Sequence, residues 1–212
     1  MFHEIKEKAY EATKLLAEER GECPDAIGHG VRNSHLLAIA PNASSSIICG
    51  NTSPSIEPYR ANAFVQKTKT GSSLLKNEYL EHCLDEIGMN NEDIWQSIIT
   101  HDGSVQHLEF LDDETKDIFK TGPELDQRWL VEFAADRQEY ICQSQSLNLF
   151  FPADVSKQEL HAVHMMAWKK GVKTLYYLRS EAIKRADRVS DEALRQYMFD
   201  SISDDSCLAC EG

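Results

Sequence analysis

The sequence predicts an α/β fold, because three short apolar runs alternate with longer segments of helical periodicity. The runs with strand character are residues 35–40, 146–151 and 172–178, and proline, glycine or a charged residue bounds each of them. This order of elements is typical of a sheet covered by helices. Three short strands are too few to close such a sheet, so we expect the chain to form part of a larger domain.

The amino-terminal element is predicted to be an amphipathic helix. Apolar side chains recur at helical spacing from Phe2 to Leu16, and Gly21 provides a stop. Its mixed charges and the lack of an apolar centre argue against a signal peptide, and no apolar run has the length of a membrane span. The strand at 35–40 follows a turn-rich stretch, and we expect it to be buried and to end at Pro41.

A mostly helical region is predicted next, with helices near residues 75–87, 91–100, 112–119 and 124–141. Asp112–Glu114 suits a helix amino terminus. Ser156 is expected to cap a later helix, with Glu159 as its capping-box partner, and Gly171 to end it. Residues 1–180 are expected to form the folded part, and residues 181–212, charged and weakly patterned, a flexible tail.

Composition narrows the classes of partner. A net charge of −13 and a pI near 5.0 argue against nucleic acid or an anionic membrane surface as the main partner. They are typical of a cytoplasmic protein. Six cysteines are present, and four of them are scattered singly. Among these four, we expect Cys83 and Cys142 to be reduced and buried.

A candidate phosphate-binding loop follows the first strand: Pro41, Asn42, Ala43, Ser44 and Ser45. Small residues at a strand end let backbone N–H groups approach an anion, and a helix beginning at the serines would add its dipole. A serine-rich turn that only caps a helix is the simpler interpretation.

Two further pairs are candidates for chemistry. Tyr176 and Tyr177 lie late in the third strand, where alternation would direct one ring inward and the other outward, and packing is their usual role. Cys207 and Cys210 could bind a metal, form a disulfide, exchange thiols from a mobile tail, or have no role. The histidine pairs 101/107 and 161/164 are best interpreted as surface or core residues, although the second pair has a spacing that could bind a metal.

Taken together, these segments resemble the carboxyl-terminal part of the large (α) subunit of class I ribonucleotide reductase. The resemblance covers roughly residues 30–212 and rests on the loop Pro41–Ser45 with Ile56-Glu57-Pro58 after it, the block Gly171–Tyr177, and the terminal cysteine pair. It implies the carboxyl-terminal part of a ten-stranded α/β barrel. It also implies a thioredoxin-dependent enzyme that reduces ribonucleoside diphosphates to deoxyribonucleotides by radical chemistry.

The resemblance implies a role for each motif. The loop would bind substrate phosphates, and Tyr176 and Tyr177 would carry a radical from the small (β) subunit to an active-site cysteine. Cys207 and Cys210 would re-reduce the active-site disulfide and would themselves be reduced by thioredoxin or glutaredoxin. The di-metal radical cofactor would belong to the small subunit, and no cofactor or metal is expected on this chain.

The family's radical cysteine and its partners have no match in residues 1–34. We therefore expect the chain to act with a separate amino-terminal portion of the large subunit and to be inactive without it. No role is assigned to Cys23 or Cys49. Two alternatives stay open: a non-catalytic protein that binds the small subunit or thioredoxin, and a small metal or redox protein that uses Cys207 and Cys210.

Overall fold

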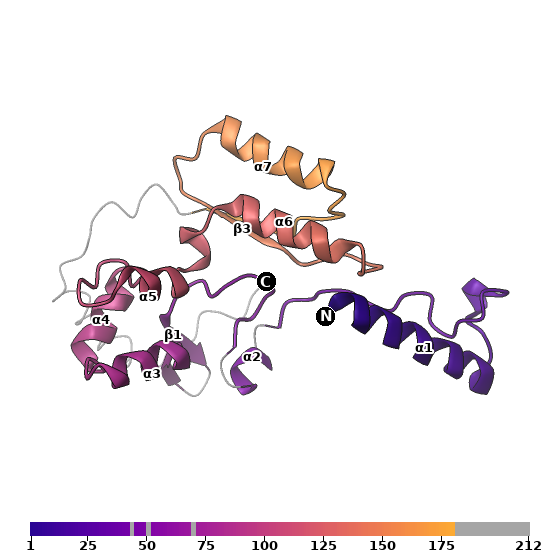
Figure 1. Cartoon of the computed structure of the whole chain (residues 1–212), viewed down its shortest axis with the longest axis horizontal. Helices are drawn as coiled ribbons and strands as arrows, with labels where there is room; N and C mark the ends of the chain where they lie inside the picture. The colour runs from indigo at the N-terminus through magenta and orange to yellow at the C-terminus, as the bar shows by residue number, and fades with distance from the viewer. Residues whose placement is uncertain (43–44, 50–51, 69–70, 181–212) are drawn as a thin grey trace. The chain divides into compact units, whose positions relative to one another are not determined.

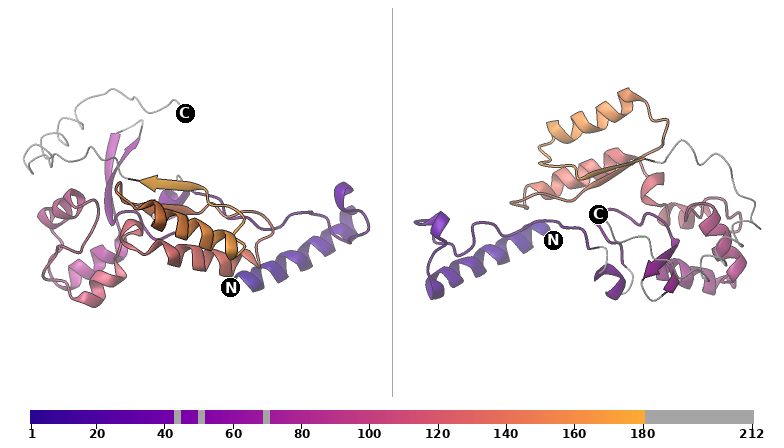
Figure 2. Two further views of the ribbon diagram at one scale, coloured as in Figure 1. Left: turned by 90° about the horizontal axis from the view of Figure 1, so that it is seen from above. Right: turned by 180° about the vertical axis from the view of Figure 1, so that it is seen from behind.

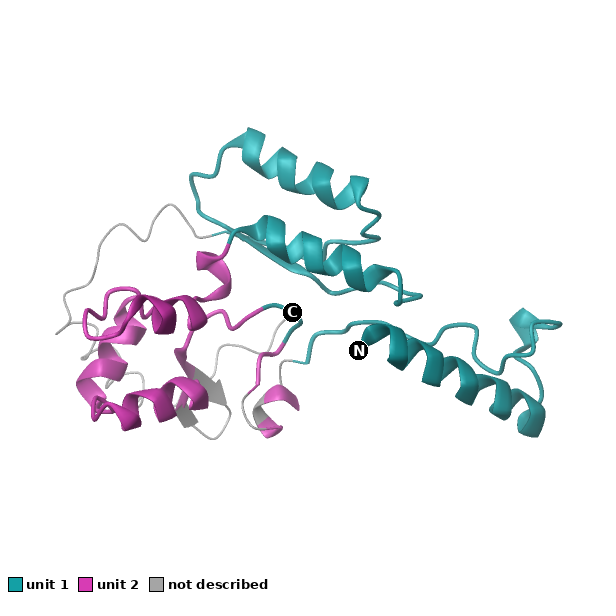
Figure 3. Cartoon of the chain, in the orientation of Figure 1, with its two compact units in different colours: residues 1–42, 55–57, 126–180 teal, residues 43–54, 58–125, 181–212 magenta. Residues whose placement is uncertain are grey.

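A computed structural model describes residues 1–42, 45–49, 52–68 and 71–180 of the chain (Figure 1). These residues form two compact units (Figure 3). Unit 1 comprises residues 1–42, 55–57 and 126–180, and the described residues of unit 2 lie within 43–54 and 58–125. Residues 181–212, the predicted tail, lie outside the described residues, so the predicted domain boundary stays a prediction.

Unit 1 contains a two-stranded parallel sheet and helices that pack beside it. Helices α6 and α7 lie side by side, and α7 is the crossover between the parallel strands β3 and β4 (Figures 1 and 2). Its elements are α1 (Phe2–Arg20), η1 (Pro24–Ala26), α6 (Gln127–Gln138), β3 (Asn148–Phe151), α7 (Lys157–Lys169) and β4 (Tyr177–Ser180).

The core of unit 1 forms around β3, which is buried at all four positions, as expected for a short apolar run. Ser156 caps α7, as predicted, by accepting a hydrogen bond from the backbone N–H of Glu159 at 3.0 Å; the reciprocal bond of a capping box, from Ser156 N–H to the Glu159 side chain, stays a prediction. Gly171 ends the helix with a φ of +75°. The buried core residues are Leu130, Val131, Ala134, Leu147, Leu149, Phe150, Phe151, Val163 and Ala167.

The third strand begins later than predicted. Strand β4 starts at Tyr177, whereas the sequence predicted residues 172–178. Val172 donates its backbone N–H to Ala167 O at 3.0 Å and so closes the end of α7 instead of joining the sheet. Val172 and Leu175 pack against the core of unit 1. These two apolar residues before Tyr177 therefore contribute to the core, but they are not strand residues.

The predicted buried strand at 35–40 is wrong in two respects. Only Ile39 forms a β-bridge, a parallel one to Gln145, and the segment is partly or fully exposed. It does run extended beside residues 143–146, with Ile39 N–H donating to Ser144 O at 3.1 Å and Ile39 O accepting from Ser146 N at 2.8 Å. The rest of unit 1 does not cover the apolar side chains of this segment enough to bury them.

Helix α1 is confirmed and ends at Gly21, whose φ is +80°. Only Thr13 and Ala17 of this helix are buried. The segment after it folds back along the helix: Arg32 donates its backbone N–H to Thr13 O at 3.1 Å, and Asn33 donates to Thr13 Oγ1 at 2.8 Å.

Unit 2 consists of a β-hairpin and short capped helices. Its elements are α2 (Ser45–Ile48), β1 (Ala63–Thr68), β2 (Gly71–Lys76), α3 (Glu78–Glu86), α4 (Glu92–Thr100), α5 (Asp113–Ile118) and η2 (Gly122–Glu124). The side chains of Asn77, Asn91 and Asp112 each accept a backbone hydrogen bond at a helix start, which explains where these predicted helices begin. The buried core comprises Ala63, Leu80, Leu84, Trp95, Ile98, Val105, Leu108 and Leu111.

The antiparallel hairpin β1–β2 was not predicted. It pairs Ala63 with Lys76 through to Thr68 with Gly71. Its sequence, AFVQKTKTGSSLLK, has polar residues at most central positions and no alternating apolar pattern. The two strands form because they pair with each other, and the β-propensity of each segment taken alone does not reveal that pairing.

Candidate functional site

The predicted phosphate loop is only partly described. Pro41 and Asn42 belong to unit 1, Ser45 begins helix α2 in unit 2, and Ala43 and Ser44 lie outside the described residues. A short helix, α2, does begin at Ser45, and Ser45 O accepts from Cys49 N at 2.9 Å. Phosphate binding by these five residues stays a prediction.

Tyr176 and Tyr177 are in direct contact. Their ring centroids are 4.3 Å apart, and the ring planes are inclined by 66°, an edge-to-face arrangement. The neighbouring phenol of Tyr177 raises the pKa of Tyr176 above its ordinary value of 10.0. The two phenol rings are therefore direct neighbours.

The expectation that one ring points inward and the other outward is wrong. Tyr176 is 54% exposed and Tyr177 50% exposed. Strand alternation does not apply to the pair, because β4 begins only at Tyr177. Both backbone N–H groups point to one acceptor, Leu147 O, at 2.8 Å from Tyr176 N and 3.4 Å from Tyr177 N.

Sequence reasoning did not single out Arg179. Its guanidinium carbon lies 4.8 Å from the ring centroid of Tyr177, a cation–π contact. The sequence feature that could have identified Arg179 is its position two residues after Tyr177. Residues two apart in a strand lie on the same face.

Cys207 and Cys210 lie outside the described residues, so their thiol-shuttle role stays a prediction. The described cysteines 23, 49, 83 and 142 are all free thiols. Cys83 is half-buried, and burial raises the pKa of its thiol.

Cys142 is exposed, so the prediction that it is buried is wrong. Its Sγ accepts from the backbone N–H groups of Leu36 and Leu37, at 3.1 Å each. Burial raises the pKa of the thiol, but backbone hydrogen bonds, those of Leu37 and Leu36 foremost, outweigh burial and lower the pKa below its ordinary value of 9.0. The thiol of Cys142 thus contacts the backbone of the 35–40 segment and is not a core residue.

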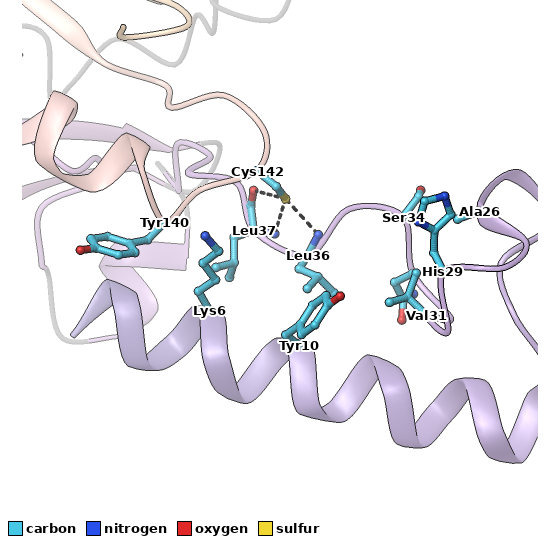
Figure 4. Close-up of a pocket in the computed structure, with 11 residues that line it drawn as sticks. Lys6, Tyr10, Ala26, His29, Val31, Ser34, Leu36, Leu37, Tyr140 and Cys142 are labelled. Atoms are coloured by element: carbon cyan, nitrogen blue, oxygen red, sulfur yellow. Dashed lines mark hydrogen bonds between the residues drawn. The ribbon is translucent and has the colours of Figure 1, made fainter. Parts of the chain in front are cut away.

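Cys142 lines a pocket of about 370 Å³ in unit 1, against which Lys6 and Tyr10 project from α1 (Figure 4). Its remaining lining residues are Ala26, His29, Val31, Asn33, Ser34, Leu36, Leu37 and Tyr140. None of the residues predicted to bind phosphate or transfer a radical lines this pocket.

The histidines form local contacts. The rings of His101 and His107 stack with centroids 3.7 Å apart, and His164 Nδ1 hydrogen-bonds Leu160 O at 2.7 Å within α7. Across the described ranges, no group of three or more His, Cys, Asp or Glu residues could hold a metal ion. None of the described helices is both long enough and apolar enough to cross a membrane.

The comparisons with known proteins agree on one family. The sequence model described as "Ribonucleotide reductase, barrel domain" matches residues 24–178. A protein of Frog virus 3 named "Putative ribonucleoside-diphosphate reductase large subunit" is 46% identical over 212 residues, which is 100% of this chain and 36% of the relative. The "Ribonucleoside-diphosphate reductase large subunit" of Invertebrate iridescent virus 6 is 47% identical over 208 residues, covering 96% of this chain and 21% of the relative.

A solved structure is similar as well. The Actinobacillus ureae class Id ribonucleotide reductase alpha subunit superposes with a TM-score of 0.78 at 40% identity, covering 85% of this chain and 33% of that one. The chain thus spans between 21% and 36% of the length of these relatives.

Proposed function

The chain belongs to the ribonucleotide reductase family through its barrel domain, and we propose that it is part of the large subunit of a class I enzyme. In this proposal the enzyme reduces ribonucleoside diphosphates to deoxyribonucleotides for DNA synthesis, in the cytoplasm and by radical chemistry. The names of the relatives support the substrate class. The mixture of helices with a parallel strand pair supports a part of a ten-stranded α/β barrel.

The observation that carries this proposal is the contact between Tyr176 and Tyr177, at 4.3 Å between ring centroids. One phenol gives an electron and a proton to a radical from the small subunit, whose di-metal centre is the oxidant. The resulting neutral tyrosyl radical takes an electron and a proton from the neighbouring tyrosine and becomes a phenol again. The radical now on that neighbour then takes an electron and a proton from an active-site cysteine thiol. Adjacent phenols in contact suit this transfer, because an electron and a proton move together and no net charge develops.

The other predicted residues complete the proposed roles. Pro41, Asn42, Ala43, Ser44 and Ser45 bind the diphosphate of the substrate. Cys207 and Cys210 reduce the active-site disulfide formed at each turnover and become a disulfide themselves, which thioredoxin or glutaredoxin then reduces.

The proposed enzyme requires more than this chain. The relatives are several times longer than the matched region, so the remaining amino-terminal portion of the large subunit supplies the cysteine that becomes a radical. The small subunit supplies the radical itself. The alternative function, a non-catalytic protein that binds the small subunit or thioredoxin, predicts binding to these partners without turnover in any assembly.

The test is turnover of the assembled enzyme with Tyr176→Phe or Tyr177→Phe. We expect each change to abolish deoxynucleotide formation, because phenylalanine has no phenolic proton to release, and to leave nucleotide binding unchanged. Tyr10→Phe, an exposed tyrosine of α1, is the matched control and should retain turnover. Normal turnover by either the Tyr176→Phe or the Tyr177→Phe variant would contradict radical transfer through the pair.

A further inference from the structure

Strand register places three polar side chains on one face of the β3–β4 sheet. Asn148 of β3 is paired with Tyr177 of β4, and Arg179 follows Tyr177 by two positions. Paired residues share a face in a parallel sheet, and so do residues two apart in one strand. Asn148, Tyr177 and Arg179 therefore project from the same face.

The buried carboxylate of Glu57 holds Asn148 in place through hydrogen bonds. Glu57 is only 2% exposed, and its Oε1 accepts a short hydrogen bond from the backbone N–H of Asn148. Both carboxylate oxygens also accept from Asn148 Nδ2, at 3.2 Å each. Arg137, half-buried beside it, is a nearby positive charge: burial lowers the pKa of Arg137, and Glu57 opposes that shift. A buried carboxylate is costly, so its hydrogen bonds to Asn148 are needed to offset its desolvation.

These bonds determine which way the amide of Asn148 points. The NH2 group of Asn148 faces Glu57, because its Nδ2 donates to both oxygens of that side chain. The amide oxygen then faces Arg179, whose Nε donates to Asn148 Oδ1 at 3.3 Å. The same guanidinium lies 4.8 Å from the ring centroid of Tyr177. A continuous set of contacts thus links the buried Glu57 to the exposed face of the tyrosine.

We propose that Arg179, oriented by Asn148 and Glu57, is a positioning residue that holds the Tyr177 ring in contact with Tyr176. This inference rests on the proposed function of the pair in radical transfer. Both rings are about half exposed, so core packing alone does not restrain them. A planar guanidinium can lie over a ring while its Nε is hydrogen-bonded, a geometry that lysine does not reproduce. Misplacement of a reacting group by about 1 Å is enough to slow a reaction on the order of 100-fold.

The test combines a spectroscopic and a kinetic measurement on Arg179→Met and Arg179→Lys. 3-Fluorotyrosine is placed at position 177 of the chain, and its ¹⁹F resonance reports the guanidinium over the ring without requiring activity. We expect Arg179→Met to shift this resonance and to lower kcat of the assembled enzyme about tenfold, with KM for the nucleotide unchanged. Arg179→Lys keeps the positive charge but loses the planar guanidinium. Its ¹⁹F shift and its kcat should lie between those of the wild type and those of Arg179→Met.

Two controls make the result specific. Arg20→Met removes an exposed arginine at the end of α1 and should change neither the resonance nor kcat. A second label at Tyr79, in unit 2, should not respond to Arg179→Met. An unmoved resonance at position 177, or an unchanged kcat despite a shift, would overturn the inference. If the wild-type assembly gives no turnover, the proposed function fails, while the ¹⁹F resonance still decides whether Arg179 orients the ring.

Discussion

His107 shows at the scale of one residue how the fold selects a protonation state. Its Nε2 hydrogen-bonds Ser97 Oγ at 2.8 Å, and its Nδ1 is buried without a hydrogen-bond partner in the described part of the chain. Burial lowers the pKa of His107 below its ordinary value of 6.5, and the stacked His101 and nearby Lys116 lower it further, whereas Glu124 opposes them. The fold therefore favours the neutral ring.

This shift predicts that unit 2 loses stability in mild acid. Below pH 6.5 the unfolded chain binds a proton at His107, but the folded unit does not until the pH reaches its lower folded pKa. The contribution of His107 to the unfolding free energy is therefore fully present above this window and falls across it. We expect a lower urea midpoint at about pH 5.5 than at about pH 7.5, with part of this difference lost in His107→Gln.

The matched control is His82→Gln in α3. The His82 side chain is 76% exposed, so its replacement removes an imidazole from the surface of unit 2 and should leave the difference between the two urea midpoints in place. A His107→Gln protein whose urea midpoints follow the wild type at both pH values would rule out His107 as the source.

At the scale of elements, Gly103 joins the end of α4 to the hairpin. Its φ is +84°, its N–H donates to Ile98 O at 2.8 Å, and its carbonyl accepts from Asn62 N and Asn62 Nδ2, at 3.0 Å each. A Cβ added here would collide with the backbone and side chain of Ala61. Asn62 in turn donates to Phe119 O at 2.8 Å, so the junction ties α4, β1 and the end of α5 together.

We expect Gly103→Ala to destabilise the protein by about 2 to 4 kcal/mol, because it adds an overpacked contact to an unfavourable backbone conformation. Gly88→Ala is the matched control: its φ is +70°, but nothing lies within 4 Å of the added Cβ. It should cost only about 1 kcal/mol, for the backbone conformation. Chemical denaturation measures both values, and equal losses would show that the clash with Ala61 relaxes freely.

Helix ends were predictable from the sequence because their chemistry is local. Ser156, Asp112 and Gly171 each act within a few residues of their own position, and the structure confirms all three. Strands were harder, since their partners are distant in sequence. The sequence does not predict the β1–β2 hairpin, and the apolar run at 35–40, predicted to be a buried strand, is partly or fully exposed.

The candidate site divides in the same way. The loop residues and the two adjacent tyrosines could be singled out from local sequence, but the orientation of the tyrosine rings could not, because β4 begins only at Tyr177 and both rings are exposed. The role of Arg179 could not be predicted, because it depends on the β3–β4 register and on Glu57, which lies 91 residues before Asn148. Contacts of such sequence separation leave no periodic signal.

At the scale of the whole molecule, the proposed enzyme separates radical transfer from re-reduction. In this proposal Tyr176 and Tyr177 transfer the radical in each turnover, whereas Cys207 and Cys210 act only after an active-site disulfide has formed. Removing one thiol of the terminal pair leaves the first turnover of a pre-reduced enzyme possible. It prevents the second, because a single thiol cannot complete the exchange that releases both active-site sulfurs.

Cys207→Ser and Cys210→Ser are therefore expected to form one equivalent of deoxynucleotide in the assembled enzyme and then to stop when thioredoxin is the reductant. A small dithiol that enters the active site directly should restore continuous turnover. Cys49→Ser, which removes an exposed cysteine in unit 2, should cycle normally and controls for the loss of any thiol. Counting deoxynucleotide formed per enzyme with each reductant separates these outcomes, and sustained thioredoxin-driven turnover by either tail variant would exclude the thiol shuttle. Loss of even the first turnover would instead place these cysteines in the radical chemistry, a role that the proposed separation of the two steps does not predict.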